Sequence, residues 1–539
     1  MKTTKIGPFL GVNNRLPDFE LQPEPSKSPS RYVRSALNVD LDNAGNFCRR
    51  ESELLVQAMT APHSLHLTSE TEGYLVRASA IYAVVVAPAY SETFVKLLSS
   101  DAPVSWVAEG DSIYYANGTD SGRITAGVFY PLGLPTPDEP TLTATSGQLD
   151  AGNYQVAISF INNITKEESG TSSSGSVSVA ALGGVTVTLP TPPSGATHTN
   201  VYLSSVNGSI PMLVGTYVTG TPSATFISAA NVGREAPQRF ESPLPSGRLF
   251  MSKGRLCSFD DTGMLYIGLP YRYGYYDMVA GWMQFNAPVS FAIENQNGTY
   301  IAADKTYWIP GDLGDVKDTI SEPFPFGAVL GTEWRHPATT DIGWFSENGF
   351  IVANTQGEAV PVTFDYLDIT NLPDEGVSNI RWTDGYVRVY SCGYCMNLEN
   401  NHPTQYTGYD FTSFAGDFGT KIDGVYALTD SAAKVSAKVG LGKQDFSTEE
   451  LKHLPNVYLG CSSPEPLEMQ VQWPDPRTGE IQDYTYPARN ADTSVRMQRV
   501  DVGKGARSSW FDLTVYNQSG SDFTLASVSF TPLASGRRI

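Results

Sequence analysis

The chain has 539 residues, enough for several domains of about 100–200 residues each. Hydrophobic residues make up 41% and charged residues only 17%, which excludes a largely disordered chain. The formal net charge of −20 argues against a surface that clamps nucleic acid by neutralising phosphates. Many glycines, prolines, tyrosines and phenylalanines, with no long helical runs, favour short strands joined by tight turns. The composition therefore predicts an all-β fold.

The N-terminus and the cysteines indicate where the chain folds. Lys2 and Lys5 lead into Gly7-Pro8 without an apolar core behind them, so we expect no signal peptide. No run of about 18 apolar residues occurs, so we expect no membrane segment. Five cysteines in so long a chain do not make a disulfide framework. We therefore expect synthesis and folding in a reducing cytoplasm.

A strand–turn–strand unit recurs through much of the chain. Each copy places apolar runs around a turn of Gly, Asp or Asn, as at Glu109–Asp111 and Glu347–Gly349. The spacing of about 30–50 residues between copies is typical of β-propeller blades. No fixed repeat signature is present, so ordinary β-meanders in a sandwich remain the alternative. The copies are Gly73–Val86, Val104–Asn117, Gly247–Gly268, Thr299–Pro310 and Ile342–Asn354.

Residues 135–240 differ in amino-acid composition from the sequence on either side. A Pro-rich linker from Leu134 opens a segment rich in Thr, Ser, Val and Gly that contains no cysteine. About 100 residues with seven or so short strands are typical of an immunoglobulin-like sandwich. We interpret the segment as a fibronectin type III-like module inserted in a loop. The clearest strands are expected at Gly152–Ile161, Val177–Ala181, Val185–Leu189, Asn200–Ser204 and Met212–Val218.

The repeating units stop near Ile422, and a different pattern follows. Ser447–Glu450 matches a capping box, which predicts one short helix at Leu451–Leu454. Alternating strands come next and predict a C-terminal β-sandwich. These strands are Leu467–Trp473, Tyr484–Pro487, Arg496–Val502, Trp510–Tyr516 and Phe523–Phe530. The predicted organisation is a propeller-like body in two parts (1–134 and 241–421), the inserted module (135–240) and the terminal sandwich (422–539).

Two local patterns resemble metal or redox sites. Asp40, Asp42 and Glu51 have part of the spacing of a calcium loop, but Ala44 supplies no side-chain oxygen and no helices flank it. A hairpin turn explains the same residues. Cys392 and Cys395 form a Cys-x-x-Cys pair without a second pair to complete a zinc site. We interpret them as two buried cysteines at a strand turn.

No catalytic motif is evident. The sequence has no Gly-x-Ser-x-Gly elbow and no His-Glu-x-x-His. Its histidines are scattered, at His63, His66, His198, His336, His402 and His453. A pair of carboxylates for glycoside hydrolysis needs only suitable geometry, so it stays open as the enzymatic alternative. We expect no catalytic, cofactor-binding or metal-binding residues and a protein that is not an enzyme.

The N-terminal sequence motifs are the most specific indication of a protein family in the chain. Gly11–Pro17 (GVNNRLP) is followed by Arg34–Asp40 (RSALNVD) and by Gly45-x-x-x-Arg49-Arg50. This pattern resembles the opening of tail nozzle, hub or stabilisation proteins of short-tailed bacteriophages. Further similarity lies at His63–His66, Ser105-Trp106, Tyr114–Thr119, Ser509–Phe511, Phe530 and Arg537–Ile539.

The resemblance implies a structural role in a virion tail. Proteins of that family are propeller-like subunits that form a hexameric ring below the portal and adaptor and extend the DNA channel. The resemblance carries no catalytic residues over. The expected partners are further copies of the chain, the adaptor and portal, fibres or the tail tip, and passing DNA that is not bound specifically. An acidic channel wall would suit that role because it repels phosphates.

Two other functions stay open. One is a peripheral receptor-binding tail protein that recognises host glycan through exposed aromatic residues, namely Tyr271, Tyr273, Tyr275, Tyr276 and Trp282. The other is a glycan-cleaving propeller enzyme. A nozzle forms a ring on the particle axis, an adhesin lies at the tail periphery, and a glycosidase turns over polysaccharide.

Overall fold

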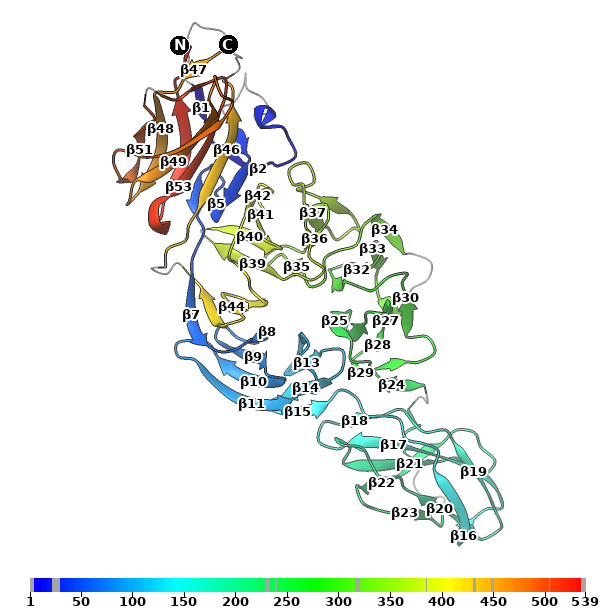
Figure 1. The fold of residues 1–539 in the computed structure, drawn as a ribbon. Coiled ribbons are helices and arrows are strands. Elements are labelled where there is room, and N and C mark those ends of the chain that lie inside the picture. Colours follow the sequence, from blue (N-terminus) through cyan, green and yellow to red (C-terminus); the bar gives the residue numbers. More distant parts are fainter. Residues whose placement is uncertain are drawn as a thin grey trace. The chain divides into compact units, whose positions relative to one another are not determined.

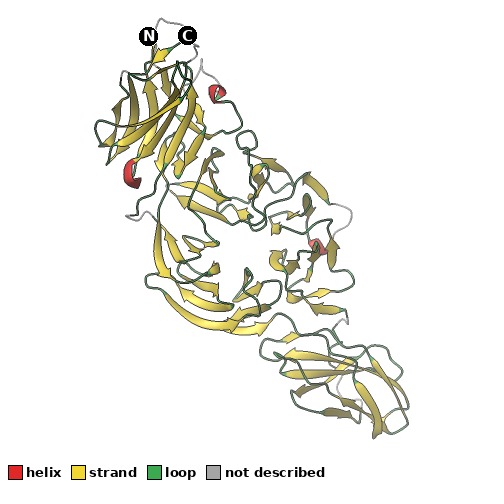
Figure 2. Ribbon diagram, viewed as in Figure 1, coloured by secondary structure: helices red, strands yellow, loops and turns green. Residues whose placement is uncertain are grey.

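The computed structural model describes residues 4–21, 30–228, 233–237, 240–315, 320–383, 385–429, 433–446, 450–503 and 505–534. Within these residues the chain is all-β, as predicted. Helix is confined to three short 3-10 turns, η1 (Asp18–Glu20), η2 (Leu313–Asp315) and η3 (Gln518–Gly520) (Figure 2). None of the described helices is long and apolar enough to cross a membrane. The chain forms two compact units, unit 1 (1–75, 84–91 and 326–539) and unit 2 (76–83 and 92–325).

A β-sandwich in unit 1 is built from both ends of the chain. Figure 1 shows N-terminal strands, in blue, among the orange and red C-terminal ones. Its first sheet contains β1 (Thr4–Ile6), β5 (Val39–Leu41), β6 (Phe47–Arg49), β48 (Asn456–Ser463), β51 (Asp492–Asp501) and β54 (Thr524–Phe530). Its second contains β4 (Ser35–Leu37), β46 (Lys438–Gln444), β53 (Phe511–Asn517), β49 (Leu467–Pro474) and β50 (Ile481–Pro487).

Apolar residues from both chain ends fill one core between these sheets. Phe9 and Phe47 lie in that core with Val457, Met469 and Phe511. Burial alternates residue by residue along β49 and β53, the period that a strand with one buried face requires. Two small sheets complete this part, a parallel pair of β2 (Phe9–Val12) with β3 (Arg31–Val33), and the set β47 (Lys452–His453), β52 (Arg507–Ser508) and β55 (Leu533–Ala534).

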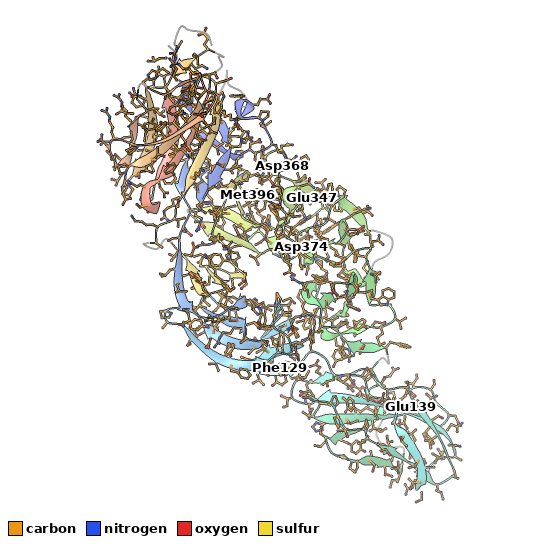
Figure 3. The ribbon with its side chains drawn as sticks, viewed as in Figure 1. Phe129, Glu139, Glu347, Asp368, Asp374 and Met396 are labelled. Atoms are coloured by element: carbon orange, nitrogen blue, oxygen red, sulfur yellow. The ribbon has the colours of Figure 1, made fainter. Side chains whose placement is uncertain are left out.

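Unit 1 also contains four-stranded antiparallel meanders, the unit from which propeller blades are made. One is β35 (Trp334–Arg335), β36 (Ile342–Ser346), β37 (Gly349–Ala353) and β38 (Ala359–Pro361). A second is β39 (Ser378–Thr383), β40 (Tyr386–Ser391), β41 (Tyr394–Asn397) and β42 (His402–Gln405), and it joins the second sandwich sheet through β4. Met396 on β41 is fully buried, whereas Glu347 in the β36–β37 turn is exposed (Figure 3).

One meander of unit 1 combines distant parts of the chain. It is formed by β43 (Ser413–Ala415), β44 (Phe418–Lys421), β45 (Gly424–Leu428) and β7 (Glu53–Ala58). The outer strand β7 comes from the N-terminal region, more than 350 residues before β45 in the sequence. This pairing joins the first meander-forming residues of the chain to the last.

Another four-stranded sheet includes the segments at which the two units divide. Its strands are β8 (His63–Leu67), β9 (Glu72–Arg77), β10 (Ala80–Val85) and β11 (Ser91–Leu97).

Unit 2 repeats the same meander. Three four-stranded sheets are present, the first being β12 (Ser105–Glu109), β13 (Ser112–Ala116), β14 (Ser121–Thr125) and β15 (Val128–Pro131). The next are β25 (Arg248–Ser252), β26 (Arg255–Phe259), β27 (Met264–Tyr266) and β30 (Trp282–Gln284), then β31 (Phe291–Glu294), β32 (Gly298–Ala302), β33 (Thr306–Pro310) and β34 (Ser321–Phe324). A small sheet of β24 (Glu241–Pro243), β28 (Gly268–Leu269) and β29 (Arg272–Asp277) lies beside them.

The inserted module is a sandwich with a core of its own. One sheet contains β16 (Thr141–Leu149), β20 (Gly183–Thr188) and β23 (Ser223–Phe226). The other contains β17 (Gly152–Asn162), β18 (Glu167–Glu168), β19 (Gly175–Val179), β21 (His198–Leu203) and β22 (Met212–Val218). All members of the core between them, from Leu149 to Phe226, come from this segment. The propeller-like fold class with an inserted sandwich and a terminal sandwich is therefore confirmed.

β1, β4 and β6 pair with C-terminal strands, and β5 joins the first sandwich sheet through β6, because their apolar faces complete the terminal sandwich core. One expectation differs from the structure. The helix expected at Leu451–Leu454 is wrong, since Lys452–His453 is strand β47, paired with β52 and β55. Tertiary pairing overrides the local helix signal there. Residues 447–449 of the capping box and the terminal Arg537–Ile539 lie outside the described residues.

Candidate functional site

The residues of the N-terminal motif form a network inside unit 1. Asn13 is buried, and its Oδ1 accepts hydrogen bonds from the backbone N–H groups of Arg15 (3.1 Å) and Leu16 (3.0 Å). Arg15 Nε donates to the carbonyl of Leu367 at 2.6 Å, and Asn14 exchanges two hydrogen bonds with the backbone of Asp368. The motif thus fixes an irregular segment against residues some 350 positions later in the sequence.

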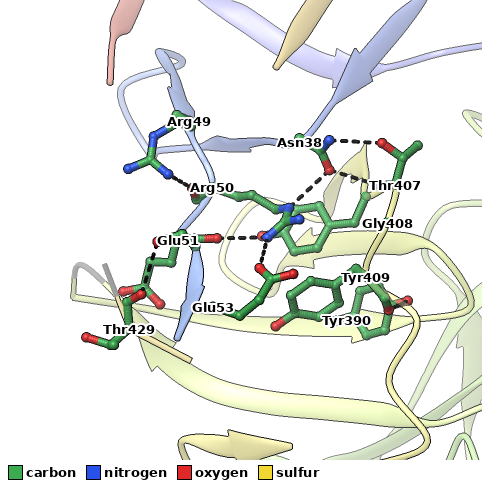
Figure 4. Close-up of polar contacts among 12 residues, drawn as sticks. Asn38, Arg49, Arg50, Glu51, Glu53, Tyr390, Thr407, Gly408, Tyr409 and Thr429 are labelled. Atoms are coloured by element: carbon green, nitrogen blue, oxygen red, sulfur yellow. Dashed lines mark hydrogen bonds and ion pairs between the residues drawn. The ribbon is translucent and has the colours of Figure 1, made fainter. Parts of the chain in front are cut away.

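Arg50 is the centre of the second half of this network (Figure 4). Its side chain is buried, donates to Asn38 Oδ1 at 3.0 Å and pairs with Glu53 at 2.8 Å. The guanidinium also lies over the rings of Tyr406 and Tyr409, 5.3 and 4.8 Å from their centroids. Such stacking supplements the ion pair. Arg50 therefore joins the N-terminal strands to the meander that contains β40–β42.

Arg50 and Lys421 share the carboxylate of Glu53. Lys421 Nζ contacts the second oxygen of Glu53 at 2.7 Å. Burial acts to raise the pKa of Glu53, but Arg50 and Lys421 outweigh it, so the pKa lies below its ordinary value. Asn38 has a positive φ of 55°, which asparagine tolerates better than most residues, and its amide also binds Thr407. This cluster stabilises the fold, and its polar groups bind one another.

The residues of the calcium-like pattern do not converge. Asp40 is buried, accepts a hydrogen bond from Tyr406 and faces Arg388 at 3.9 Å. Asp42 accepts from the backbone of Asn46 at 2.8 Å and closes the β5–β6 hairpin. Glu51 pairs with Arg381 at 2.9 Å. The hairpin accounts for Asp42, whereas Asp40 and Glu51 pair with arginines of β40 and β39. The cavity beside Asp40 measures only about 30 Å³.

The Cys-x-x-Cys pair lies on the β40–β41 hairpin. Cys392 occupies the turn with a φ of 50°, and Cys395 lies on β41. Both thiols are free, and burial raises the pKa of Cys395 to about 12 and that of Cys392 above its ordinary value. A thiolate is the form that binds metal or attacks a disulfide, so this environment disfavours both reactions. Within the described residues no three His, Cys, Asp or Glu side chains gather closely enough to hold a metal ion.

A cavity of about 500 Å³ lies in unit 2, and this size is within the usual range for a ligand pocket. Its wall includes Tyr271, Tyr273 and Tyr275, three of the aromatic residues considered for glycan recognition. Tyr271 is 81% exposed, whereas Tyr275 is fully buried and its hydroxyl accepts a hydrogen bond from the Leu134 N–H at 2.7 Å. Tyr276 packs against another tyrosine instead, with Tyr266 at 5.4 Å between ring centroids. Tyr273 and Tyr275 on β29 and Tyr271 just before it therefore line the cavity, and Tyr276 does not.

The inserted sandwich supplies some of the charged residues of the same cavity. Glu167 accepts from the Gly133 N–H at 3.0 Å and faces Arg123 at 3.5 Å. Burial raises the pKa of Glu167 above its ordinary value, although Arg123 opposes the shift. The neighbouring Glu168 also lines the cavity and pairs with Arg234.

The pKa values of the two glutamates shift in opposite directions. Burial acts to raise the pKa of Glu168, but hydrogen bonds from Ser159, Tyr202 and Arg234 outweigh it and lower the pKa. Glu168 is therefore an ionised structural group, with Asn200 donating to it at 2.7 Å as well. What the cavity offers a ligand is a set of guanidinium and phenol hydrogen-bond donors beside an exposed aromatic ring.

Sequence reasoning missed the charged half of this cavity. Lys166, Glu167 and Glu168 form a charged run in a segment otherwise rich in Thr and Ser, and that contrast was the available signal. Arg123 and Arg272 gave no signal, because they lie on strands far from this run in the sequence. Only the packing of the module within unit 2 brings them together.

Comparisons with known proteins do not identify a family. No family model matches the chain, and no curated protein is similar to it. Among solved structures, an exo-β-1,3-galactanase from Phanerochaete chrysosporium is 9% identical, covers 79% of this chain and 95% of its own, and has a TM-score of 0.17. The N-terminal domain of Nup159 is 11% identical, with 74% and 95% covered and a TM-score of 0.21. An arabinoxylan arabinofuranohydrolase from Bacillus subtilis is 9% identical, with 87% and 96% covered and a TM-score of 0.17. These similarities are too low to carry an argument about function.

Proposed function

We propose that the chain is a structural protein of a phage tail and forms a ring, with six copies, that extends the DNA channel below the portal and adaptor. The observation that carries the proposal is the role of the motif residues. Asn13, Arg15, Asn38 and Arg50 are the residues on which the resemblance to nozzle proteins rests, and each stabilises the scaffold of unit 1. A motif with this role is typical of a structural subunit.

Exposed apolar residues on two edge strands supply a contact surface for assembly. β50 and β51 are the outer strands of the two sandwich sheets, and the C-terminal part of β51 already pairs with Ala488 and Arg489. Ile481 on β50 is 55% exposed, and Val495 and Met497 on β51 are 61% and 54% exposed. Val495 and Met497 lie two residues apart on one face of β51, and exposed apolar patches mark protein contacts. A closed ring needs a heterologous contact, in which this surface meets a different face of the next copy.

The charge of the chain fits passage of DNA without binding. At −20 the protein repels a phosphate backbone over roughly a Debye length, about 8–10 Å at physiological salt. A protein that neutralised several phosphates would bind duplex DNA with strong salt dependence. The proposed ring guides DNA and leaves it free to move, while the adaptor, portal, fibres or tip contact its outer surfaces.

Electron microscopy of the purified chain and of the virion tests the proposal. We expect rings with a central channel, on the tail axis of the particle. The Val495→Asp/Met497→Asp variant should remain folded but shift to monomers in native mass spectrometry, because charge replaces apolar contact area. Ile422→Asp is the matched control, since Ile422 is 75% exposed in a turn of a different sheet. A chain that stays monomeric in the mature particle, or one that binds duplex DNA tightly at low salt, would contradict the proposal.

A further inference from the structure

The cavity in unit 2 differs in charge from the rest of the chain. Its wall contains four basic side chains, Arg123, Lys166, Arg234 and Arg272, and three acidic ones, Glu167, Glu168 and Glu235. The whole chain, by contrast, carries 56 acidic and 36 basic residues. The raised pKa of Glu167 reduces the negative charge of the wall further as the pH falls. Each of the three arginines pairs with a glutamate, Arg123 with Glu167, Arg234 with Glu168 and Arg272 with Glu241. The wall is therefore close to neutral and repels an anionic group less than the acidic chain as a whole does.

Two of the basic groups are positioned to meet a ligand. Lys166 is exposed, at the turn before β18, and Arg234 keeps 52% of its side chain exposed although it pairs with Glu168. Arg123 adds a buried donor, because its Nε has no hydrogen-bond partner within the described residues. A buried donor without a partner costs free energy that a ligand oxygen would recover.

The aromatic part of the wall is suited to a sugar ring. Tyr271 exposes 81% of its surface beside the cavity, so its ring is open to contact with a ligand. Tyr273 is held in place by a hydrogen bond to Glu109 at 3.2 Å and an edge contact with Tyr114 at 5.7 Å between centroids. A saccharide presents apolar C–H groups to such a ring and hydroxyl groups to the neighbouring donors.

We infer that this cavity binds an oligosaccharide that carries carboxylate groups. Tyr271 covers a sugar ring, Lys166 and Arg234 bind the carboxylate, and Arg123 donates to a hydroxyl or carboxylate oxygen. Simple anions lack the apolar face that Tyr271 contacts, and neutral sugars offer no carboxylate to the exposed ammonium group of Lys166. The inference does not depend on ring formation, since every residue involved belongs to unit 2.

Titration calorimetry on the full chain tests this inference, with trigalacturonate as the probe and maltotriose as the neutral comparison. We expect trigalacturonate to bind and maltotriose to bind much more weakly. Tyr271→Ala and Lys166→Gln should each weaken binding of trigalacturonate about tenfold, the scale of one well-placed contact. Both residues are exposed, so both variants should fold. Phe94→Ala, which removes a 57% exposed ring on β11, is the matched control and should leave binding unchanged.

Three outcomes would overturn the inference. These are no heat of binding with trigalacturonate, equal binding of maltotriose, or equal loss of binding in Phe94→Ala and Tyr271→Ala. Native mass spectrometry of the same samples reports the oligomeric state separately. A ring that does not bind trigalacturonate would contradict only the proposed binding by the cavity. A monomer that binds trigalacturonate would contradict only the proposed ring.

Discussion

Replacing Arg50 with methionine removes the cation at the centre of the network in Figure 4 while keeping a side chain of similar length. The variant loses the hydrogen bond to Asn38 at 3.0 Å, the bond to the Glu51 carbonyl at 2.9 Å and the ion pair with Glu53 at 2.8 Å. Methionine still packs against the two tyrosine rings, because its thioether makes favourable aromatic contacts. The experiment therefore isolates the polar part of the interaction.

The expected cost follows from burial and from the remaining partners. Removing one member of a buried ion pair costs roughly 3–5 kcal/mol. Lys421 still contacts Glu53 at 2.7 Å, and Thr407 N–H still donates to Asn38 at 2.9 Å. We therefore expect a loss at the low end, about 3 kcal/mol.

Hydrogen exchange reports this loss locally, which suits a chain with several cooperative parts. Backbone amides of β5, β6 and β42 should exchange roughly a hundred times faster in Arg50→Met, since about 1.4 kcal/mol corresponds to tenfold. Amides of the inserted sandwich should not change. Arg477→Met, at an exposed arginine, is the matched control and should change stability by less than about 0.5 kcal/mol. A loss in Arg50→Met no larger than in the control would refute the structural role of the motif.

Three further predictions concern pH, thiols and domain independence. Because the pKa of Glu53 is lowered in the folded protein, its ionised form stabilises the fold above the ordinary pKa of 4.5, and this stabilisation is lost as the pH falls through the folded pKa. Glu53→Gln should therefore make the free energy of unfolding less dependent on pH in the acid range, and identical pH dependence in the two proteins would disprove this. Cys392→Ser/Cys395→Ser should leave metal content unchanged in elemental analysis, and stoichiometric zinc lost only in the variant would show the opposite. Replacing Thr136–Arg239 with a short Gly/Ser linker should leave a folded remainder by circular dichroism, because the inserted core draws only on that segment; an insoluble product would argue against it.

Strand positions in the periodic segments were predictable from local patterns. Met212–Val218 is strand β22 as expected, and Gly152–Ile161 matches β17 to within one residue. The turns at Glu109–Asp111 and Glu347–Gly349 join hairpin strands as their Gly and Asp or Asn residues predict. These features depend on alternation and turn chemistry within a few residues, and both can be read along the chain.

The division of the chain into domains at residues 134, 240 and 421 remains a prediction, because the two compact units have boundaries at other residues. The N-terminal motif was recognised by its residues, but its role as an internal network could not be read from them. Asn13, Arg15 and Arg50 bind partners about 350 residues away or on other strands, and no local pattern specifies such partners.

The sequence by itself determined the all-β class, the hairpins and the distinct composition of the inserted module. These features depend on composition, on the alternation of apolar and polar residues and on turn residues, all of which act over short distances along the chain. Tertiary structure alone decided that the N-terminal strands complete the terminal sandwich, that Lys452–His453 is a strand, and that Arg123 lies beside Glu167. Each of these outcomes depends on which apolar faces and charges meet after distant segments are brought together. That choice is made by the free energy of the packed core and is not contained in the local pattern of any one segment.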